Sequence, residues 1–180
     1  GIRSPMSRSN LAYANEQRDW RIYADFAQVL IQQAVRLYGE HEYLPGLQQA
    51  AYAFDSPTIE LCRSLFPWAR FGTRAAGVKL HTLLDLRTDL PIFACITPRR
   101  IHDVQLLDRI PWQSGAIYVL DRGYLDCARL FRIHRASAFF IIRARRDLHC
   151  YRHRSAEVVK STGLRADQTV SLVSYYPLRA

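Results

Sequence analysis

The sequence lacks the features that mark a membrane-spanning or secreted protein. No apolar run approaches the roughly 20 residues that a transmembrane helix needs, and the longest one, residues 136–142, has the length of a strand. The first ten residues contain no apolar segment typical of a signal peptide, and position 1 is not methionine. We therefore expect a cytoplasmic protein whose sequence begins within a longer reading frame.

The cysteines of the chain show no spacing typical of disulfides or of metal sites. Its four cysteines, at positions 62, 95, 127 and 150, form no CxxC pair and no spacing typical of a disulfide framework. His149, Cys150 and His153 lie close together, but no fourth ligand follows at a spacing typical of zinc sites, so an exposed polar turn is expected there. The composition, 49% hydrophobic and 23% charged, is that of a globular domain.

Lysine is scarce, and the charge is uneven. The chain has 23 Arg and two Lys, and its net charge is +9. Residues 1–60 hold five Arg against seven acidic residues, whereas residues 61–180 hold 20 Lys or Arg against nine, a net charge of +11. A GC-rich genome would raise the arginine content of any surface. The asymmetry between the two parts nevertheless favours a polyanionic partner, most simply nucleic acid.

Hydrophobic periodicity predicts a mixture of helices and strands. Apolar residues recur at helical spacing over residues 19–38, a stripe that we interpret as packing surface, and Ser9 is a candidate N-cap for a shorter helix before it. Further helical patterns cover residues 103–110 and 125–135. The expected strands are residues 50–54, 78–86, 91–96, 116–120 and 138–142. This order predicts an α/β fold, with a mixed sheet flanked by helices.

Two of the expected strands end on an aspartate. "AYAFD" ends at Asp55 and "IYVLD" ends at Asp121. The two acids could build a metal site, or each could only begin a turn. If the two strands are neighbours, both carboxylates lie close enough to share Mg²⁺, and a pair of ions suits phosphodiester chemistry. Asp85 also follows a strand, but Arg87 and Asp89 beside it favour a turn.

Four sequence blocks together resemble a known family. They are "SRSNLAYANEQRDWRIYADFAQVL", "AFDSPTIELCRSLFPWA", "VKLHTLLDL" and "YVLDRGYLDCARLFRIHRASAFFIIRAR", and with them the resemblance covers roughly residues 7–170. In this order they resemble the DDE transposases of bacterial insertion sequences, and more narrowly the insertion-sequence-four-like group. The resemblance implies an RNase H-like catalytic core.

The resemblance implies a role for particular residues. Asp55 and Asp121 match the family's first two catalytic, metal-binding aspartates, which implies two Mg²⁺ or Mn²⁺ ions in the complete site. The implied partner is DNA, at the ends of the element and at the target, and the full-length protein is expected to form a homodimer on it. Arg122 and Tyr124 flank the second aspartate and could contact phosphate or brace the loop. A further group could hold DNA phosphates or merely solvate a strand end: Arg143, Arg145 and Arg146.

The chain departs from the family pattern in two ways. Pro57 stands where the family more often has threonine. The third acid of the family lies in a helical Y-x2-R-x3-E motif beyond a β-rich insertion, and the sequence ends within that expected insertion. Tyr151, Arg154 and Glu157 imitate the motif, but the glutamate comes one position early. We therefore expect a fragment that is inactive in strand transfer by itself; the alternative is a non-catalytic, basic DNA-binding remnant of a decayed element.

The same resemblance predicts three parts of the chain. They are an N-terminal helical segment, a partial RNase H-like core and the start of the β-rich insertion, at residues 1–45, 46–143 and 144–180.

Overall fold

The computed structural model describes residues 7–41, 46, 48–61, 70–71, 75–146 and 148–173. The chain divides into two compact units. The first comprises residues 1–47 and 56–100, and the second comprises residues 48–55 and 101–180. None of the helices in the described ranges is long and apolar enough to cross a membrane. The predicted boundaries after residues 45 and 143 stay a prediction.

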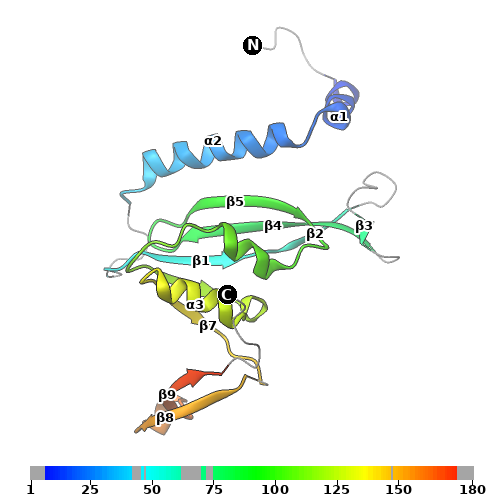
Figure 1. Cartoon of the computed structure of the whole chain (residues 1–180). Coiled ribbons are helices and arrows are strands. Elements are labelled where there is room, and N and C mark those ends of the chain that lie inside the picture. Colours follow the sequence, from blue (N-terminus) through cyan, green and yellow to red (C-terminus); the bar gives the residue numbers. More distant parts are fainter. Residues whose placement is uncertain are drawn as a thin grey trace. The chain divides into compact units, whose positions relative to one another are not determined.

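The first unit joins two helices to antiparallel strands (Figure 1). Its elements are α1 (Arg8–Gln17), α2 (Arg21–Tyr38), β2 (Thr58–Leu61), β3 (Arg70–Phe71), β4 (Ala75–Asp85) and β5 (Leu90–Pro98). The central strand is β4, which pairs antiparallel with each of the other three strands. The hairpin of β4 and β5 agrees with the prediction, whereas β2 and β3 were not predicted.

The two N-terminal helices differ from the prediction in detail. Ser7, and not Ser9, caps α1, because the Ser7 hydroxyl accepts a hydrogen bond from the Asn10 amide at 3.2 Å. The predicted helix over residues 19–38 is confirmed by α2, and the Gln28 side chain donates to the Ala94 carbonyl of β5 at 2.9 Å.

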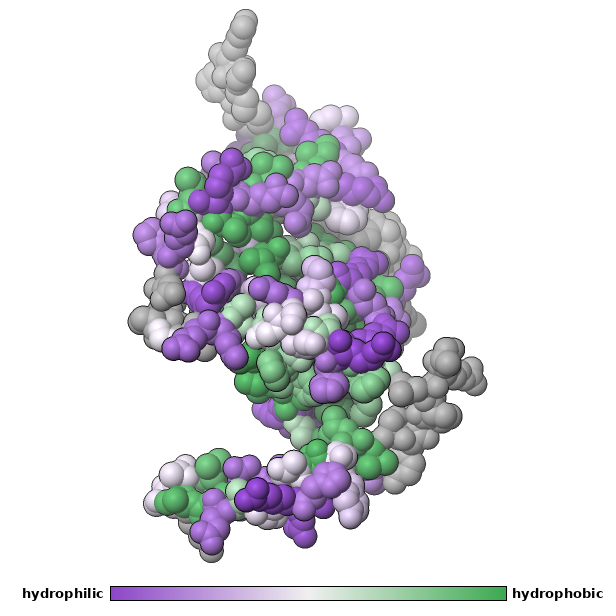
Figure 2. Space-filling model, turned by 60° about the vertical axis from the view of Figure 1, so that its left-hand side comes forward, coloured by the Kyte–Doolittle hydropathy of each residue, from purple (hydrophilic) through white to green (hydrophobic). Residues whose placement is uncertain are grey.

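The predicted packing stripe of α2 is largely wrong. Its residues Ala27, Ile31 and Ala34 are half-buried, but the large side chains of the stripe are exposed: Trp20, Tyr23, Phe26, Leu30 and Leu37. The half-buried positions lie on the same helix as Gln28, which bonds β5, so only this part of the stripe packs. Figure 2 shows the hydropathy of the surface, on which apolar residues lie among polar ones.

The second unit holds parallel strands, one α-helix and a separate β-ribbon (Figure 1). Its elements are β1 (Ala51–Asp55), η2 (Asp103–Arg109), β6 (Ile117–Leu120), η3 (Arg122–Tyr124), α3 (Cys127–Arg135), β7 (Phe139–Ile142), β8 (Cys150–Ala156), η4 (Lys160–Thr162) and β9 (Asp167–Leu172). Strand β6 pairs parallel with β1 on one side and with β7 on the other. The elements labelled η are 3₁₀ turns, so the predicted helix over residues 103–110 is a 3₁₀-helix.

The core of this unit lies between the parallel strands and the helical elements beside them. Alternate residues of β6, Tyr118 and Leu120, are buried. They belong to a larger set of buried side chains that includes Leu106, Leu107, Tyr124, Leu130 and Ile133. Parallel and antiparallel strands, together with helices, confirm the predicted mixed α/β class. The strand order also satisfies the condition set by the sequence, because the strands that end at Asp55 and Asp121 are neighbours.

Candidate active site

Asp55 and Asp121 lie side by side at one edge of the parallel strands. Phe54 of β1 is opposite Leu120 of β6, so the next residue of each strand is an aspartate. Parallel neighbours of this kind lie about 4.8 Å apart. Asp121 keeps an extended backbone, with φ −74° and ψ 163°, and both aspartates are exposed. The register therefore presents two accessible carboxylates together, as the sequence predicted.

The chain after Asp121 is held by the packing of an aromatic side chain. Residues 122–124 form η3, in which the Tyr124 amide donates to the Asp121 carbonyl at 3.0 Å. Tyr124 is only 2% exposed and its ring contacts that of Phe54, the residue before Asp55. A side chain buried to this degree does not reach a DNA backbone, so of the two predicted roles of Tyr124 the structure favours bracing the loop.

Arg122 is half-buried beside Asp121. Its Nε atom is inaccessible to solvent and has no hydrogen-bond partner among the described residues. Arg143, Arg145 and Arg146, the other predicted DNA contacts, follow β7 and are exposed. Arg143 comes directly after Ile142, which is opposite Leu120 in the register of β6 and β7. It therefore begins at the same edge as the two aspartates, whereas Arg145 and Arg146 lie further along the chain.

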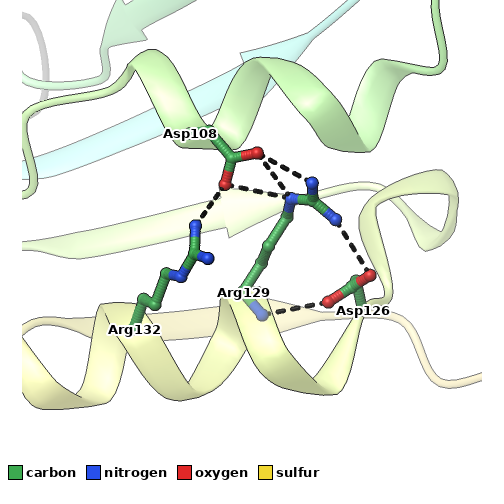
Figure 3. A network of polar contacts seen from close by, with 4 residues as sticks. All are labelled: Asp108, Asp126, Arg129 and Arg132. Carbon is green, nitrogen blue, oxygen red and sulfur yellow. Dashed lines mark hydrogen bonds and ion pairs between the residues drawn. The ribbon is translucent and has the colours of Figure 1, made fainter. Parts of the chain in front are cut away.

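A network of ion pairs holds the start of α3, the helix that follows the Asp121 loop (Figure 3). Asp126 caps α3 by accepting from the Arg129 amide at 3.0 Å. The Arg129 guanidinium donates to Asp126 at 3.1 Å and to Asp108 of η2 at 2.7 Å, and Arg132 donates to Asp108 at 2.6 Å. Asp126 is thus the N-cap of α3. One arginine joins the helix start to η2.

The charges of this network shift the pKa values of its members. The hydrogen bond from Arg129 lowers the pKa of Asp108; desolvation opposes this shift, and the charges of Arg129 and Arg132 add to it. The hydrogen bond with Asp108 likewise raises the pKa of Arg129. Both shifts favour the charged pair. The network was missed in the sequence because its members lie 21 and 24 positions apart; only the Asp126 to Arg129 spacing at a helix start gave a signal.

The described residues supply a partial ligand set for a metal ion. No group of three or more His, Cys, Asp or Glu residues that could hold a metal occurs within the described ranges. Two adjacent carboxylates nevertheless fit Mg²⁺, which binds through one or two carboxylates and keeps several waters. Glu157 follows the exposed strand β8, which contains Tyr151 and Arg154. Because these two residues lie on a strand, they do not form the helical motif of the family.

Asp85 and several other polar residues have structural roles. Asp85 ends β4 and accepts from the Arg87 amide at 2.9 Å, with an ion pair to Arg87 at 3.2 Å, which confirms a turn. His81 is fully buried and bonds Thr97 across the hairpin at 2.8 Å. His102 precedes η2 as its N-cap, and the His102 side chain makes no capping hydrogen bond there.

The predicted polar turn around His149 is wrong in part. Cys150 and His153 lie on strand β8, and His153 bonds Ser171 of β9 at 2.6 Å. A two-stranded ribbon that is exposed along its length gives no apolar face for a periodicity signal to detect. Within the described part of the chain, Cys95, Cys127 and Cys150 form no disulfide bond.

Two adjacent carboxylates suit divalent metal ions, and pairs of such ions serve enzymes that act on phosphate esters. Comparison with known proteins agrees with this class. Residues 47–180 match the family described as the transposase DDE domain. The chain belongs to that family, and its mixed α/β fold agrees with the RNase H-like core that the sequence resemblance implied.

Two curated relatives carry transposase names. One, y4zB of Sinorhizobium fredii, is 34% identical over 124 residues, which are 67% of this chain and 35% of that protein. The other, from Geobacillus stearothermophilus, is named for insertion sequence element IS5377 and is 28% identical over 108 residues, 60% of this chain and 28% of that protein. The chain thus spans about a third of the length of each. Membership of the insertion-sequence-four-like group stays a prediction.

Proposed function

We propose that the chain forms part of the catalytic core of a bacterial insertion-sequence transposase, which cleaves DNA at the ends of its element and joins those ends to a target. Asp55 and Asp121 are the catalytic carboxylates in this proposal. A DNA substrate would place the action of the protein in the bacterial cytoplasm, at the nucleoid, and the complete protein would act as a homodimer. Competence for both steps would require a third acid.

The parallel pairing of β1 and β6 carries the proposal. Sequence position separates Asp55 from Asp121, but the register brings the ends of both strands to one edge and leaves both carboxylates exposed. Other aspartates of this chain have structural roles. Asp85, Asp108 and Asp126 each hold a hydrogen bond or ion pair with an arginine, and each stabilises a turn or a helix start.

The donor set fits Mg²⁺ or Mn²⁺. Both aspartates are hard oxygen ligands at neighbouring strand ends, and water or phosphate oxygens would complete the coordination. Bound ions supply charge stabilisation at the scissile phosphate and lower the pKa of a water or hydroxyl nucleophile. The protein would hold the carboxylates in place, through the pairing of β1 with β6 and through the contact between Phe54 and Tyr124.

Cation binding tests the proposal directly. Asp55→Asn and Asp121→Asn are each expected to weaken Mn²⁺ binding roughly tenfold or more in calorimetric titration, because each variant loses a charged ligand. Asp89→Asn is the matched control. Asp89 lies in the β4–β5 turn at φ 57°, a conformation that asparagine tolerates. Asp89→Asn removes one carboxylate that is distant in sequence from both Asp55 and Asp121, and it should leave Mn²⁺ affinity unchanged. Equal affinity in the unchanged chain and all three variants would contradict the proposal.

A second candidate function, DNA binding without catalysis, is favoured by the exposed β8–β9 ribbon. Arg152 and Arg154 lie on this ribbon and are exposed, as are Arg145 and Arg146 before it. Such a surface binds phosphates independently of the two aspartates. The two candidates differ in one measurable respect: only the catalytic one makes divalent cation binding depend on Asp55 and Asp121.

A further inference from the structure

The third parallel strand extends the row of charged residues at the site. In the register of the three strands, Ile117 of β6 is opposite both Ala51 of β1 and Phe139 of β7. On β6, the alternate positions after Ile117 are Val119 and then Asp121, which follows the end of the strand. Because Phe54, Leu120 and Ile142 are partners in adjacent strands, the residues that follow them form one line: Asp55, Asp121 and Arg143.

Asp55 ends β1, whereas Asp121 and Arg143 come directly after β6 and β7, at positions that continue one face of these strands. Side chains of a strand alternate between its two faces. The odd-numbered positions of β7, Phe139 and Ile141, are 57% and 58% exposed, whereas Tyr118 and Leu120 on the opposite face of β6 are buried. Arg143 continues the exposed positions of β7 and is itself exposed. With a strand spacing of about 4.8 Å, its backbone begins next to that of Asp121 and one strand further from that of Asp55.

Within the described part of the chain, Arg143 differs from other arginines in forming no ion pair. Arg129 and Arg132 are committed to Asp108, and Arg87 is committed to Asp85. Arg143, in contrast, has no hydrogen bond or ion pair with any described residue. An arginine side chain is suited to bind the non-bridging oxygens of a DNA phosphate bidentately, and such a contact would offset the repulsion between the phosphate and the two aspartates.

We propose that Arg143 is a substrate-binding residue of the active site, which holds the DNA phosphate that Asp55 and Asp121 address, and that this role sets it apart from Arg145 and Arg146. The inference rests on the proposed function, because it takes the two aspartates as the cation-binding pair. It assigns one particular phosphate contact to the site, whereas the other arginines add to the general attraction for DNA.

Two measurements on the 180-residue chain separate these roles. In Mn²⁺ titration without DNA, Arg143→Ala should bind Mn²⁺ about two- to fivefold more tightly than the unchanged chain at low salt, because a positive charge next to the cation is removed. Arg146→Ala, the control, removes the same charge three positions further along the chain and should leave the affinity unchanged. The expected change is opposite in sign to that of Asp55→Asn and Asp121→Asn.

In fluorescence anisotropy with a short DNA duplex and saturating Mn²⁺, Arg143→Ala should weaken binding about tenfold, and Arg146→Ala about two- to threefold at most. Arg143→Lys keeps the charge and loses the bidentate geometry, so its affinity should fall between those of the unchanged chain and Arg143→Ala. Circular dichroism should show all three variants folded, since Arg143 and Arg146 are exposed.

The outcomes distinguish this inference from the proposed function. Equal effects of Arg143→Ala and Arg146→Ala in both measurements, while Asp55→Asn and Asp121→Asn weaken Mn²⁺ binding, overturn the inference alone. Unchanged Mn²⁺ binding in the aspartate variants overturns the proposed function, and the inference with it. Tighter Mn²⁺ binding together with weaker DNA binding in Arg143→Ala supports both.

Discussion

The ring of Tyr124 packs against the ring of Phe54, with centroids 5.0 Å apart and planes inclined at 55°. Both side chains are 2% exposed. Phe54 is the residue before Asp55, and Tyr124 lies three residues after Asp121. One buried contact therefore joins the strand end that carries the first carboxylate to the loop that carries the second.

Removal of the Tyr124 ring should destabilise the fold and loosen the site together. Tyr124→Ala is expected to lower the free energy of unfolding by about 3–5 kcal/mol, the usual cost of deleting a buried aromatic ring, measured by urea denaturation. Mn²⁺ affinity of the folded variant should also fall, because the loop is no longer fixed against Phe54. Tyr151→Ala, whose side chain on β8 is 65% exposed, is the control and should change stability by less than about 0.5 kcal/mol. Equal stability of the two variants would contradict the bracing role.

The Asp108 network should contribute stability that depends on pH. The pKa of Asp108 is lowered, chiefly by the hydrogen bond from Arg129. Its contribution is therefore complete above the pKa of an unfolded aspartate, near 3.9, and is lost as the pH falls through the lower value of the folded state. We expect Asp108→Asn to lower the melting temperature at pH 7, and the difference from the unchanged chain to shrink in acid.

The size of this effect is limited by solvent. The Asp108 and Arg132 side chains are 36% and 64% exposed, so the loss at pH 7 should be only about 1 kcal/mol, the upper range for accessible ion pairs. Added salt should reduce it further. Asp19→Asn, which removes an exposed ion pair with Arg21 at the start of α2, should leave the melting temperature unchanged. A pH-independent difference between Asp108→Asn and the unchanged chain would contradict the electrostatic explanation.

The buried hydroxyl of Tyr118 should make the folded protein less stable at alkaline pH. Burial raises the pKa of this tyrosine, and the hydrogen bond that its hydroxyl accepts from the Gln113 amide at 2.9 Å opposes the shift. Above the ordinary tyrosine pKa, near 10, the unfolded chain releases the proton while the folded chain retains it, so stability falls as the pH rises. Melting temperatures between pH 8 and pH 11 should decline more steeply for the unchanged chain than for Tyr118→Phe. Parallel curves would show that another group is responsible.

Local patterns in the sequence predicted the elements of the site well. Short apolar runs followed by a polar residue indicated the strands that end at Asp55 and Asp121. Their pairing was only a condition in the sequence, and the structure supplies it. The interpretation of Asp85 as a turn residue also succeeded, since Asp85, Arg87 and Asp89 are close in sequence. These signals are local or follow from chain order, which is what a single sequence records.

Other features depend on packing that the sequence does not encode locally. The apolar stripe of α2 predicted the helix correctly, but only part of the stripe packs: Ala27, Ile31 and Ala34 are half-buried, whereas its other large side chains are exposed. The Asp108–Arg129 pair joins residues that share no pattern. Strand β8 is exposed along its whole length, so it lacks the alternation by which strands are recognised.

Salt dependence of DNA binding distinguishes the two candidate functions. If Arg152 and Arg154 of β8 bind phosphates, replacing both with alanine should reduce the slope of log affinity against log salt by about 0.9 for each phosphate that is no longer neutralised. The measurement is anisotropy of a labelled duplex at several salt concentrations without divalent cations. Under these conditions Asp55→Asn and Asp121→Asn should leave the slope unchanged, because neither aspartate binds phosphate without a cation between them. When Mn²⁺ is added, the same two variants should lose the extra affinity that the unchanged chain gains. Absence of any Mn²⁺-dependent difference, with the arginine effect intact, would leave DNA binding as the function and exclude the catalytic assignment.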